Sequence, residues 1–243
     1  MASILRGMAG FSGTRGRYTL GMKDHPPGSV KPRAIHPPKV PARARLQNVH
    51  PGEIIDEAEL EDVRINDVDL TDCAAAHMQI RGAEITNGRA IGAEFERLQL
   101  RDVRIADADW SNMNMFGSGW TRVSITGTKL VGARLNESSL RDVSFEDCIG
   151  DLLQAQMATF ERVGFVRCRL RGAIFNQSDL SNVVFDGCDL READFSHAVL
   201  TGADVRRSDL EGIQLGPDQL RGLIVTPDQA LYLAGAIGLV IDA

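Results

Sequence analysis

Three of the four cysteines are regularly spaced and are the residues most suggestive of chemistry in this 243-residue chain. Cys148, Cys168 and Cys188 lie twenty residues apart, so a repeat of that length would stack their thiols, as a metal or redox site requires. No histidine is in phase with them, and each cysteine takes a position where neighbouring repeats carry small residues. The spacing therefore favours buried structural thiols, and we predict no metal site and no cofactor.

Other catalytic patterns are missing from the sequence. The histidines are scattered along the chain at His25, His36, His50, His77 and His197. Neither a phosphate-binding loop, nor a dinucleotide-binding glycine pattern, nor a nucleophile elbow occurs. Aspartate and glutamate are abundant, but the repeats described next place them on an outer surface where we expect no pocket. We therefore predict no catalytic residue and no enzyme.

A period of five residues runs through residues 58–215. None of the 32 residues at multiples of five from Leu60 to Leu215 is charged, and 28 of them are large and apolar. The residue two places before each is small or apolar, and again none is charged. The inward positions thus step by two, as in a strand, and then by three, which requires a bend in every repeat. Regular bending winds the chain into a coil whose turns bury their apolar residues by stacking, which predicts a solenoid.

The repeats resemble those of the pentapeptide-repeat family, whose consensus is A(D/N)LXX. The segments nearest to this consensus are 178–182 (SDLSN), 188–190 (CDL), 193–195 (ADF), 203–205 (ADV) and 208–210 (SDL). The resemblance implies an all-β solenoid, a right-handed quadrilateral β-helix with four repeats per coil. The 32 repeats then form about eight coils, with a length of roughly 38 Å at the usual strand spacing.

Four repeats per coil would stack residues that lie twenty apart. One such ladder changes from four isoleucines, Ile65 to Ile125, to three phenylalanines, Phe145 to Phe185. This order supports a twenty-residue coil independently of the family. The pattern weakens at Gly150, where Ile149 and Leu152 fall on outward positions, and we expect a bulge there.

The first fifty residues differ in composition from the rest. Residues 1–45 carry nine Lys/Arg and one acid, whereas the remaining 198 residues carry 18 basic and 32 acidic residues, a balance of −14. Because residues 1–50 are rich in proline and glycine, we predict a disordered basic arm, followed by an N-terminal cap over residues 51–57. Docking of the arm on its own acidic repeats is the rival expectation, and an Arg-rich, acid-poor tail also resembles an organelle transit peptide.

Residues 216–243 leave the pattern and are predicted to cap the open end of the solenoid. Thr226, Pro227 and Asp228 form a typical helix start, which predicts a short helix over about residues 227–237. The segment has more apolar side chains than one cap needs, and we predict that they join two copies end to end in a homodimer. These side chains are Leu231, Leu233, Ile237, Leu239, Val240 and Ile241.

Six aspartates recur every forty residues on two predicted corners of the solenoid. They are Asp62 and Asp67, Asp102 and Asp107, and Asp142 and Asp147. Quinolone-resistance members of the resembling family are acidic rods that mimic duplex DNA and bind DNA gyrase, so the resemblance implies that these carboxylates stand in for phosphates. Arg122, Arg162 and Arg167 interrupt the columns, and the alternative is an ordinary salt-bridged surface.

Two functions are therefore left open. The first is an interaction protein that binds a type II topoisomerase, DNA gyrase, and protects it from inhibitors. The second is a structural scaffold or adaptor that binds another protein through the solenoid faces or the basic arm. Neither involves direct nucleic-acid binding by the acidic repeats. The longest uncharged apolar run, residues 229–241, is too short to cross a bilayer, and we expect a cytoplasmic protein.

Overall fold

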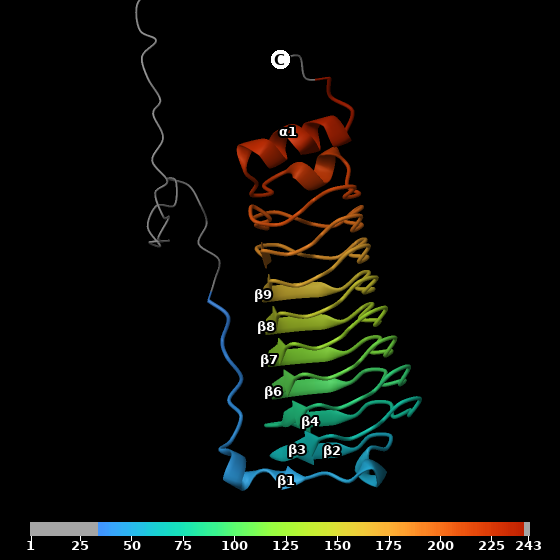
Figure 1. Ribbon diagram of the computed structural model, residues 1–243. Helices are drawn as coiled ribbons and strands as arrows, with labels where there is room; N and C mark the ends of the chain where they lie inside the picture. Colours follow the sequence, from blue (N-terminus) through green and yellow to red (C-terminus); the bar gives the residue numbers. More distant parts are fainter. Residues whose placement is uncertain (1–33, 241–243) are drawn as a thin grey trace, which may run out of the picture. The chain divides into compact units, whose positions relative to one another are not determined.

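Successive turns of the chain stack as a parallel ladder in which a residue pairs with the residue twenty positions later (Figure 1). The computed structural model describes residues 34–240, which lie within one compact unit, Pro32–Ala243. Leu100, Trp120, Leu140 and Phe160 follow one another in register in one such ladder. The predicted parallel β-solenoid with four five-residue repeats per turn is confirmed.

The longest strands lie in the middle turns. They are β6 (Gln99–Ala106), β7 (Gly119–Thr126), β8 (Ser139–Glu146) and β9 (Thr159–Val166). The shorter strands are β1 (Gln47–Asn48), β2 (Glu59–Glu61), β3 (Val63–Asn66), β4 (Gln79–Arg81), β5 (Glu84–Thr86) and β10 (Val184–Asp186). On the other sides of each turn, single bridges join residues twenty apart, as between Asp109 and Lys129.

The chain bends at the second residue after each central apolar residue, where most repeats have a positive φ. Asp62, Asp102 and Asp142 have φ values of 54°, 56° and 56°, and Gly82 at the same corner has 63°. Glycine adopts this left-handed region freely, and Asp and Asn tolerate it better than most residues. The left-handed residue supplies the bend that the step of three requires.

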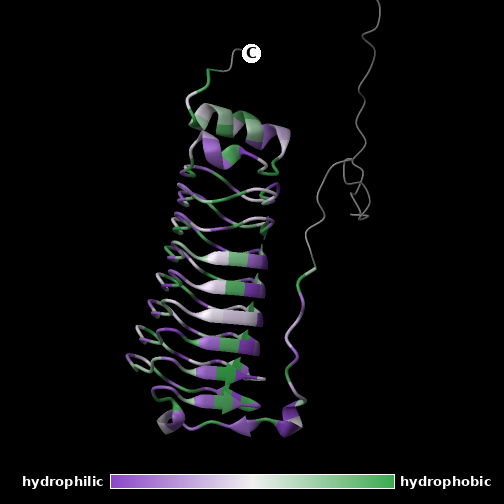
Figure 2. Cartoon of the chain, turned by 180° about the vertical axis from the view of Figure 1, so that it is seen from behind, coloured by the Kyte–Doolittle hydropathy of each residue, from purple (hydrophilic) through white to green (hydrophobic). Residues whose placement is uncertain are grey.

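The two inward positions of the repeats form one continuous apolar core, and Figure 2 lets the reader follow the hydropathy along each turn. In the later turns the core is a stack of rings, in which Phe165 lies 4.6 Å from Phe145 and 5.1 Å from Phe185 between centroids. In the early turns the side chains are smaller, and a cavity of about 40 Å³ lined by Ala90 and its neighbours lies inside.

The number of turns and the expected bulge both differ from the sequence-based prediction. About seven turns are present rather than the predicted eight. No bulge occurs at Gly150, since Ile149 bridges both Lys129 and Arg169 in unbroken register. Leu170 and Leu153 pack into the space that a side chain at position 150 would fill, so the missing side chain is compensated locally.

Both ends of the solenoid are covered. At the N-terminal end, β1 pairs with β3, and two 3₁₀ helices, Arg43–Arg45 and Pro51–Glu53, flank it. The predicted N-terminal cap was residues 51–57, but the covering segment begins earlier, at Arg43. At the other end, a 3₁₀ helix (Pro217–Leu220) precedes α1 (Pro227–Ala236), which agrees closely with the predicted helix.

Helix α1 is fixed to the last turns by one buried leucine and one amide. Leu233 is 2% exposed and belongs to the core, while the Gln229 side chain donates to the carbonyls of Val205 and Ser208 at 2.8 and 2.9 Å. Thr226 caps the helix by accepting from the Gln229 N–H. No helix among residues 34–240 is long and apolar enough to cross a membrane.

Candidate interaction surfaces

The first acidic column follows one corner of the solenoid and is largely paired within the chain. Arg122 donates to Asp102 through Nε at 2.6 Å, and Arg162 donates to both oxygens of Asp142 at 2.7 and 2.8 Å. In each pair the arginine lies one turn above the aspartate. These guanidinium groups are the main cause of the lowered pKa values of Asp102 and Asp142. Asp62 forms no ion pair among the described residues, where Gly82 occupies the next turn.

The second column is only partly paired. Arg167 donates to both oxygens of Asp147 at 2.7 and 2.9 Å and holds the pKa of this carboxyl below its usual value. Asp67 accepts a hydrogen bond from the Asn87 amide at 3.2 Å. Asp107 forms no ion pair within residues 34–240. The structure thus brings Asp102, Asp142 and Asp147 into salt bridges between neighbouring turns.

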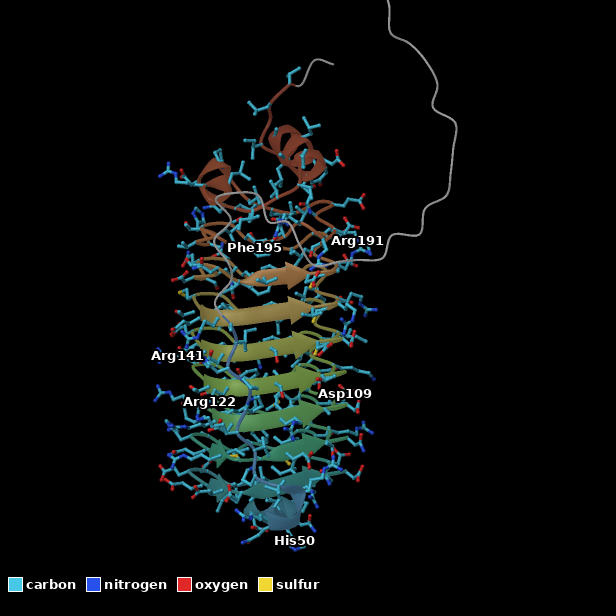
Figure 3. All side chains as sticks on the ribbon, turned by 90° about the vertical axis from the view of Figure 1, so that its left-hand side faces the viewer. His50, Asp109, Arg122, Arg141, Arg191 and Phe195 are labelled. Carbon is cyan, nitrogen blue, oxygen red and sulfur yellow. The ribbon has the colours of Figure 1, made fainter. Side chains whose placement is uncertain are left out.

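An extended segment crosses the turns beside the first column, and we call residues 34–43 the strap (Figure 3). The His36 N–H donates to Oδ1 of Asp142 at 3.1 Å, and its Nδ1 lies 2.8 Å from the same oxygen. The Lys39 N–H donates to Oδ1 of Asp102 at 2.9 Å. Two aspartates of the predicted acidic column therefore hold the chain's own N-terminal segment.

The spacing of these two contacts matches the repeat of the solenoid. Asp102 and Asp142 lie two turns apart, about 9.6 Å at the usual strand spacing. His36 and Lys39 are three residues apart, and three residues of extended polyproline II chain span about 9.3 Å. Pro37 and Pro38, which have no N–H to donate, lie between them. The strap thus presents backbone donors to two turns that lie two apart.

A buried carboxylate anchors the lower end of the strap. Glu84 is 4% exposed, and Arg43 of the strap donates to it through Nε and Nη2 at 3.2 and 3.1 Å. Arg64 and Arg104, one turn below and one turn above, lie 3.6 and 3.7 Å from the same carboxylate. Three arginines therefore balance one acid whose burial would otherwise be costly.

The side of the solenoid under the strap has small residues and is not fully covered. Ser124, Ser144 and Gly164 follow one another in the ladder, and Ile35 lies against Gly164. Between the strap and this side lies a cleft of about 320 Å³. Its lining residues are Ile35, His36, Pro37, Pro38, Arg104, Val123, Ser124 and Ser144.

The prediction of a disordered arm over residues 1–50 is wrong for residues 34–50. These residues hold defined contacts, because polar acceptors on the solenoid can order a segment that has no core of its own. The rival expectation of self-docking describes residues 34–43 correctly. Residues 1–33 lie outside the described part of the chain. Two features of the sequence indicate this docking. Aspartates recur every forty residues, and His36 and Lys39, whose N–H groups can donate, are separated by two prolines.

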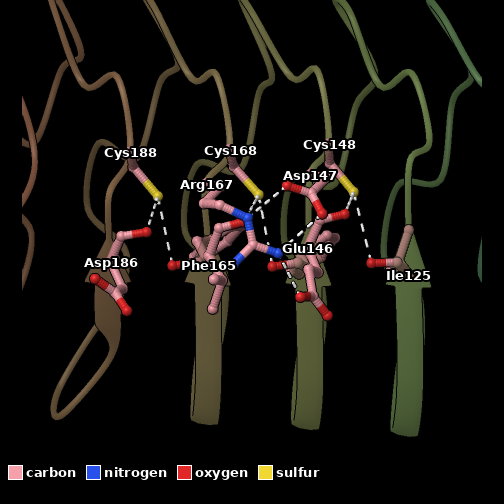
Figure 4. A network of polar contacts seen from close by, with 11 residues as sticks. Ile125, Glu146, Asp147, Cys148, Phe165, Arg167, Cys168, Asp186 and Cys188 are labelled. Carbon is pink, nitrogen blue, oxygen red and sulfur yellow. Dashed lines mark hydrogen bonds and ion pairs between the residues drawn. The ribbon is translucent and has the colours of Figure 1, made fainter. Parts of the chain in front are cut away.

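The cysteine ladder is a packing device (Figure 4). All four cysteines are free thiols, and Cys168 donates to the carbonyl of Phe145, 23 residues earlier, at 3.5 Å. Ser208 makes the equivalent bond to the Phe185 carbonyl at 3.0 Å. The neighbouring thiol of Cys168 and burial raise the pKa of Cys148, which disfavours the reactive thiolate.

The predicted dimerisation residues fall into two groups. Leu233 is buried in the cap, and Ile237 is half-buried. Leu231, Leu239 and Val240 are 57%, 59% and 97% exposed. Leu239 and Val240 belong to no strand, and Ile241 lies outside the described residues. End-to-end association through these side chains stays a prediction.

Comparison with known protein families gives matches in the later turns. Residues 118–195 match the family described as "Pentapeptide repeat region", and residues 178–213 match "Pentapeptide repeats (8 copies)". Residues 118–213 are pentapeptide repeats. The resemblance inferred from the consensus is thereby confirmed for these turns, which include the cysteine ladder.

The chain is also distantly similar to solved structures, two of which are HetL and QnrB1. HetL, from the cyanobacterium Nostoc and described as involved in heterocyst differentiation regulation, has 16% identity and a TM-score of 0.43, covering 71% of this chain and 89% of its own. QnrB1, described as a plasmid-mediated fluoroquinolone resistance protein, has 18% identity and a TM-score of 0.48, covering 76% and 99%. None of the curated proteins searched gives a match.

Proposed function

We propose that this pentapeptide-repeat protein is a non-catalytic interaction module that binds protein partners on the side faces of its solenoid. The observation that carries the proposal is the strap, because a side face here already holds an extended polypeptide through acceptors in register with the turns. Solenoid proteins use such extended, repeated surfaces to bind their partners.

A competition between three sets of variants tests this proposal. Proteins captured from a cell extract by the full chain are identified, and one partner is purified. The first set is Asp102→Gly with Asp142→Gly on the strap side, and the second is Leu152→Asp with Met157→Asp, whose side chains are 58% and 53% exposed at other corners. The third, Leu231→Asp with Leu239→Asp, lies at the C-terminal end.

We expect the first or the second set to weaken partner binding at least tenfold and the third set to leave it unchanged. Binding that responds only to the third set would place the partner on the end of the solenoid and would contradict the proposal. Circular dichroism of each variant controls for loss of the fold.

The second candidate is binding of DNA gyrase by DNA mimicry. Residues 46–243 carry 32 acids against 18 bases, which favours an acidic ligand for a DNA-binding surface. Asp62, Asp67 and Asp107 form no ion pair with arginine or lysine among the described residues, so they are the carboxylates available as phosphate mimics. The paired Asp102, Asp142 and Asp147 are less suitable.

A gyrase supercoiling assay with and without a fluoroquinolone tests mimicry. Changing Asp62, Asp67 and Asp107 together to Asn should abolish any inhibition or protection, while the folded triple Asn variant of the paired aspartates should retain more of it. Asn tolerates the left-handed corner, so the first set should fold normally. No effect of the unmodified protein at low salt excludes this candidate.

A further inference from the structure

The strap is held by few contacts for its length. The side chains of His36 and Arg43 are 67% and 78% exposed. Within the described residues the apolar core begins at Val49, and no residue of the strap belongs to it. Its polar attachments are the two backbone hydrogen bonds, the His36 ring at Asp142, the Arg43 ion pair and a hydrogen bond from Arg64 to the Arg43 carbonyl.

The fit between strap and solenoid is also incomplete. The cleft of about 320 Å³ over Ser124 and Ser144 remains open beneath Pro37 and Pro38. A segment of the same backbone geometry with a larger side chain directed at this cleft would gain contacts that the strap lacks. Such a segment could replace the strap despite the advantage of a covalently linked competitor.

The acceptors select for a particular backbone. Asp102 and Asp142 both have lowered pKa values from their arginine partners, so they are charged acceptors at neutral pH. They accept from N–H groups three residues apart in an extended chain, which fits polyproline II geometry. Glu84, buried among arginines, adds a position for a basic residue near the end of the segment.

We propose that the strap side of the solenoid is a peptide-binding site for an extended, proline-containing segment of a partner protein with a basic residue at one end. The strap fills this site within the chain until the partner segment displaces it. This inference rests on the proposed function and specifies its partner class.

A direct binding measurement uses a fluorescent peptide of residues 34–45 as the probe. It is titrated into a protein lacking residues 1–45, which retains the whole apolar core, and into the full chain. Fluorescence anisotropy should show saturable binding to the shortened protein and at least tenfold weaker binding to the full chain, where the strap competes.

Matched variants test the assigned contacts. Asp102→Gly and Asp142→Gly keep a residue suited to the left-handed corner, as Gly82 is, and each should lower peptide affinity about tenfold or more. Asp147→Gly also frees an arginine, Arg167, but lies off the strap, and should change affinity less than twofold. A peptide methylated on the Lys39 amide nitrogen loses one hydrogen-bond donor and keeps its charge. It should bind the unmodified shortened protein about as weakly as the unmethylated peptide binds the Asp102→Gly protein.

Several results would overturn the proposal. Equal peptide affinity of the Asp102→Gly, Asp142→Gly and Asp147→Gly proteins would show only charge attraction. Equal affinity of the full and shortened proteins would show that the peptide binds elsewhere. A concentration-dependent dimer of the full chain that exchanges straps would make a second copy the occupant.

Native-state hydrogen exchange provides a test in the full chain if the shortened protein does not fold. The His36 and Lys39 amides should be protected in the unmodified protein, and Asp142→Gly should increase exchange at His36 more than Asp147→Gly does. Fast exchange at both amides in the unmodified protein contradicts the site. If the peptide does not bind but the side-face variants still lose the captured partner, the peptide-binding site is excluded and the proposed function is retained.

Discussion

The interior of the solenoid and the strap are ordered by two different sequence patterns, which occur in the same repeats. The interior depends on apolar residues every two and three positions, and each turn repeats it after twenty residues. The strap depends on aspartates at every second turn, Asp102 and Asp142, and so repeats after forty. Burial decides the first arrangement and hydrogen-bond register decides the second, which predicts very different responses to substitution.

The largest effect should come from a charge in the interior. Phe165 is 1% exposed and stacked between Phe145 and Phe185, so Phe165→Asp places an unpaired carboxylate among rings and should cost several kcal/mol. Urea unfolding followed by circular dichroism measures this. A variant that unfolds at the same urea concentration as the parent would show that the five-residue register is wrong.

A smaller effect is expected where interior and strap meet. Glu84→Ala removes the acid that balances Arg43, Arg64 and Arg104 and should cost about 2 kcal/mol, since the partners keep access to water. Glu146→Ala is the control, because Glu146 is 50% exposed in its pair with Arg167 and should cost less than about 0.5 kcal/mol. Equal costs in the same unfolding assay would argue against a special role for Glu84.

Acid should weaken the strap contacts. Asp102 and Asp142 have pKa values below the ordinary 3.8, so their stabilising effect is present above pH 3.8 and is lost as pH falls through the lowered values. The double Asp102→Gly, Asp142→Gly variant should therefore lose about 1 kcal/mol less stability than the parent between pH 5 and pH 2. Parallel pH profiles of the two proteins would contradict this assignment.

Deleting residues 1–45 should have only a small effect on stability. This change removes the strap contacts but no residue of the apolar core, so the free energy of unfolding should fall by no more than about 1–2 kcal/mol. Differential scanning calorimetry checks it, with the Glu84→Ala protein as the reference for loss of the Arg43 contact. A loss as large as that of Phe165→Asp would mean that the strap belongs to the folding core.

The interior could be predicted from the sequence because apolar burial leaves a strict period, as the ladder from Ile65 through Phe165 to Val205 illustrates. Gly150 was misjudged because a missing side chain looks like a break, although Leu170 can fill the space. Composition favoured a disordered strap over the rival expectation of docking, because Ile35 and Val40 are its only large aliphatic residues. Its order comes from long-range acceptors at Asp102 and Asp142, whose partners no local pattern identifies.

The forty-residue spacing of Asp102 and Asp142 limits how this chain can change in length. Deleting one whole turn of twenty residues would leave the interior ladder intact, yet it would bring Arg122 or Gly82 to a corner where the strap meets an aspartate. Deleting two turns would restore both patterns. The interior repeats after one turn, whereas the aspartates that bind the strap repeat after two. Lineages that keep the strap should therefore gain or lose turns in pairs.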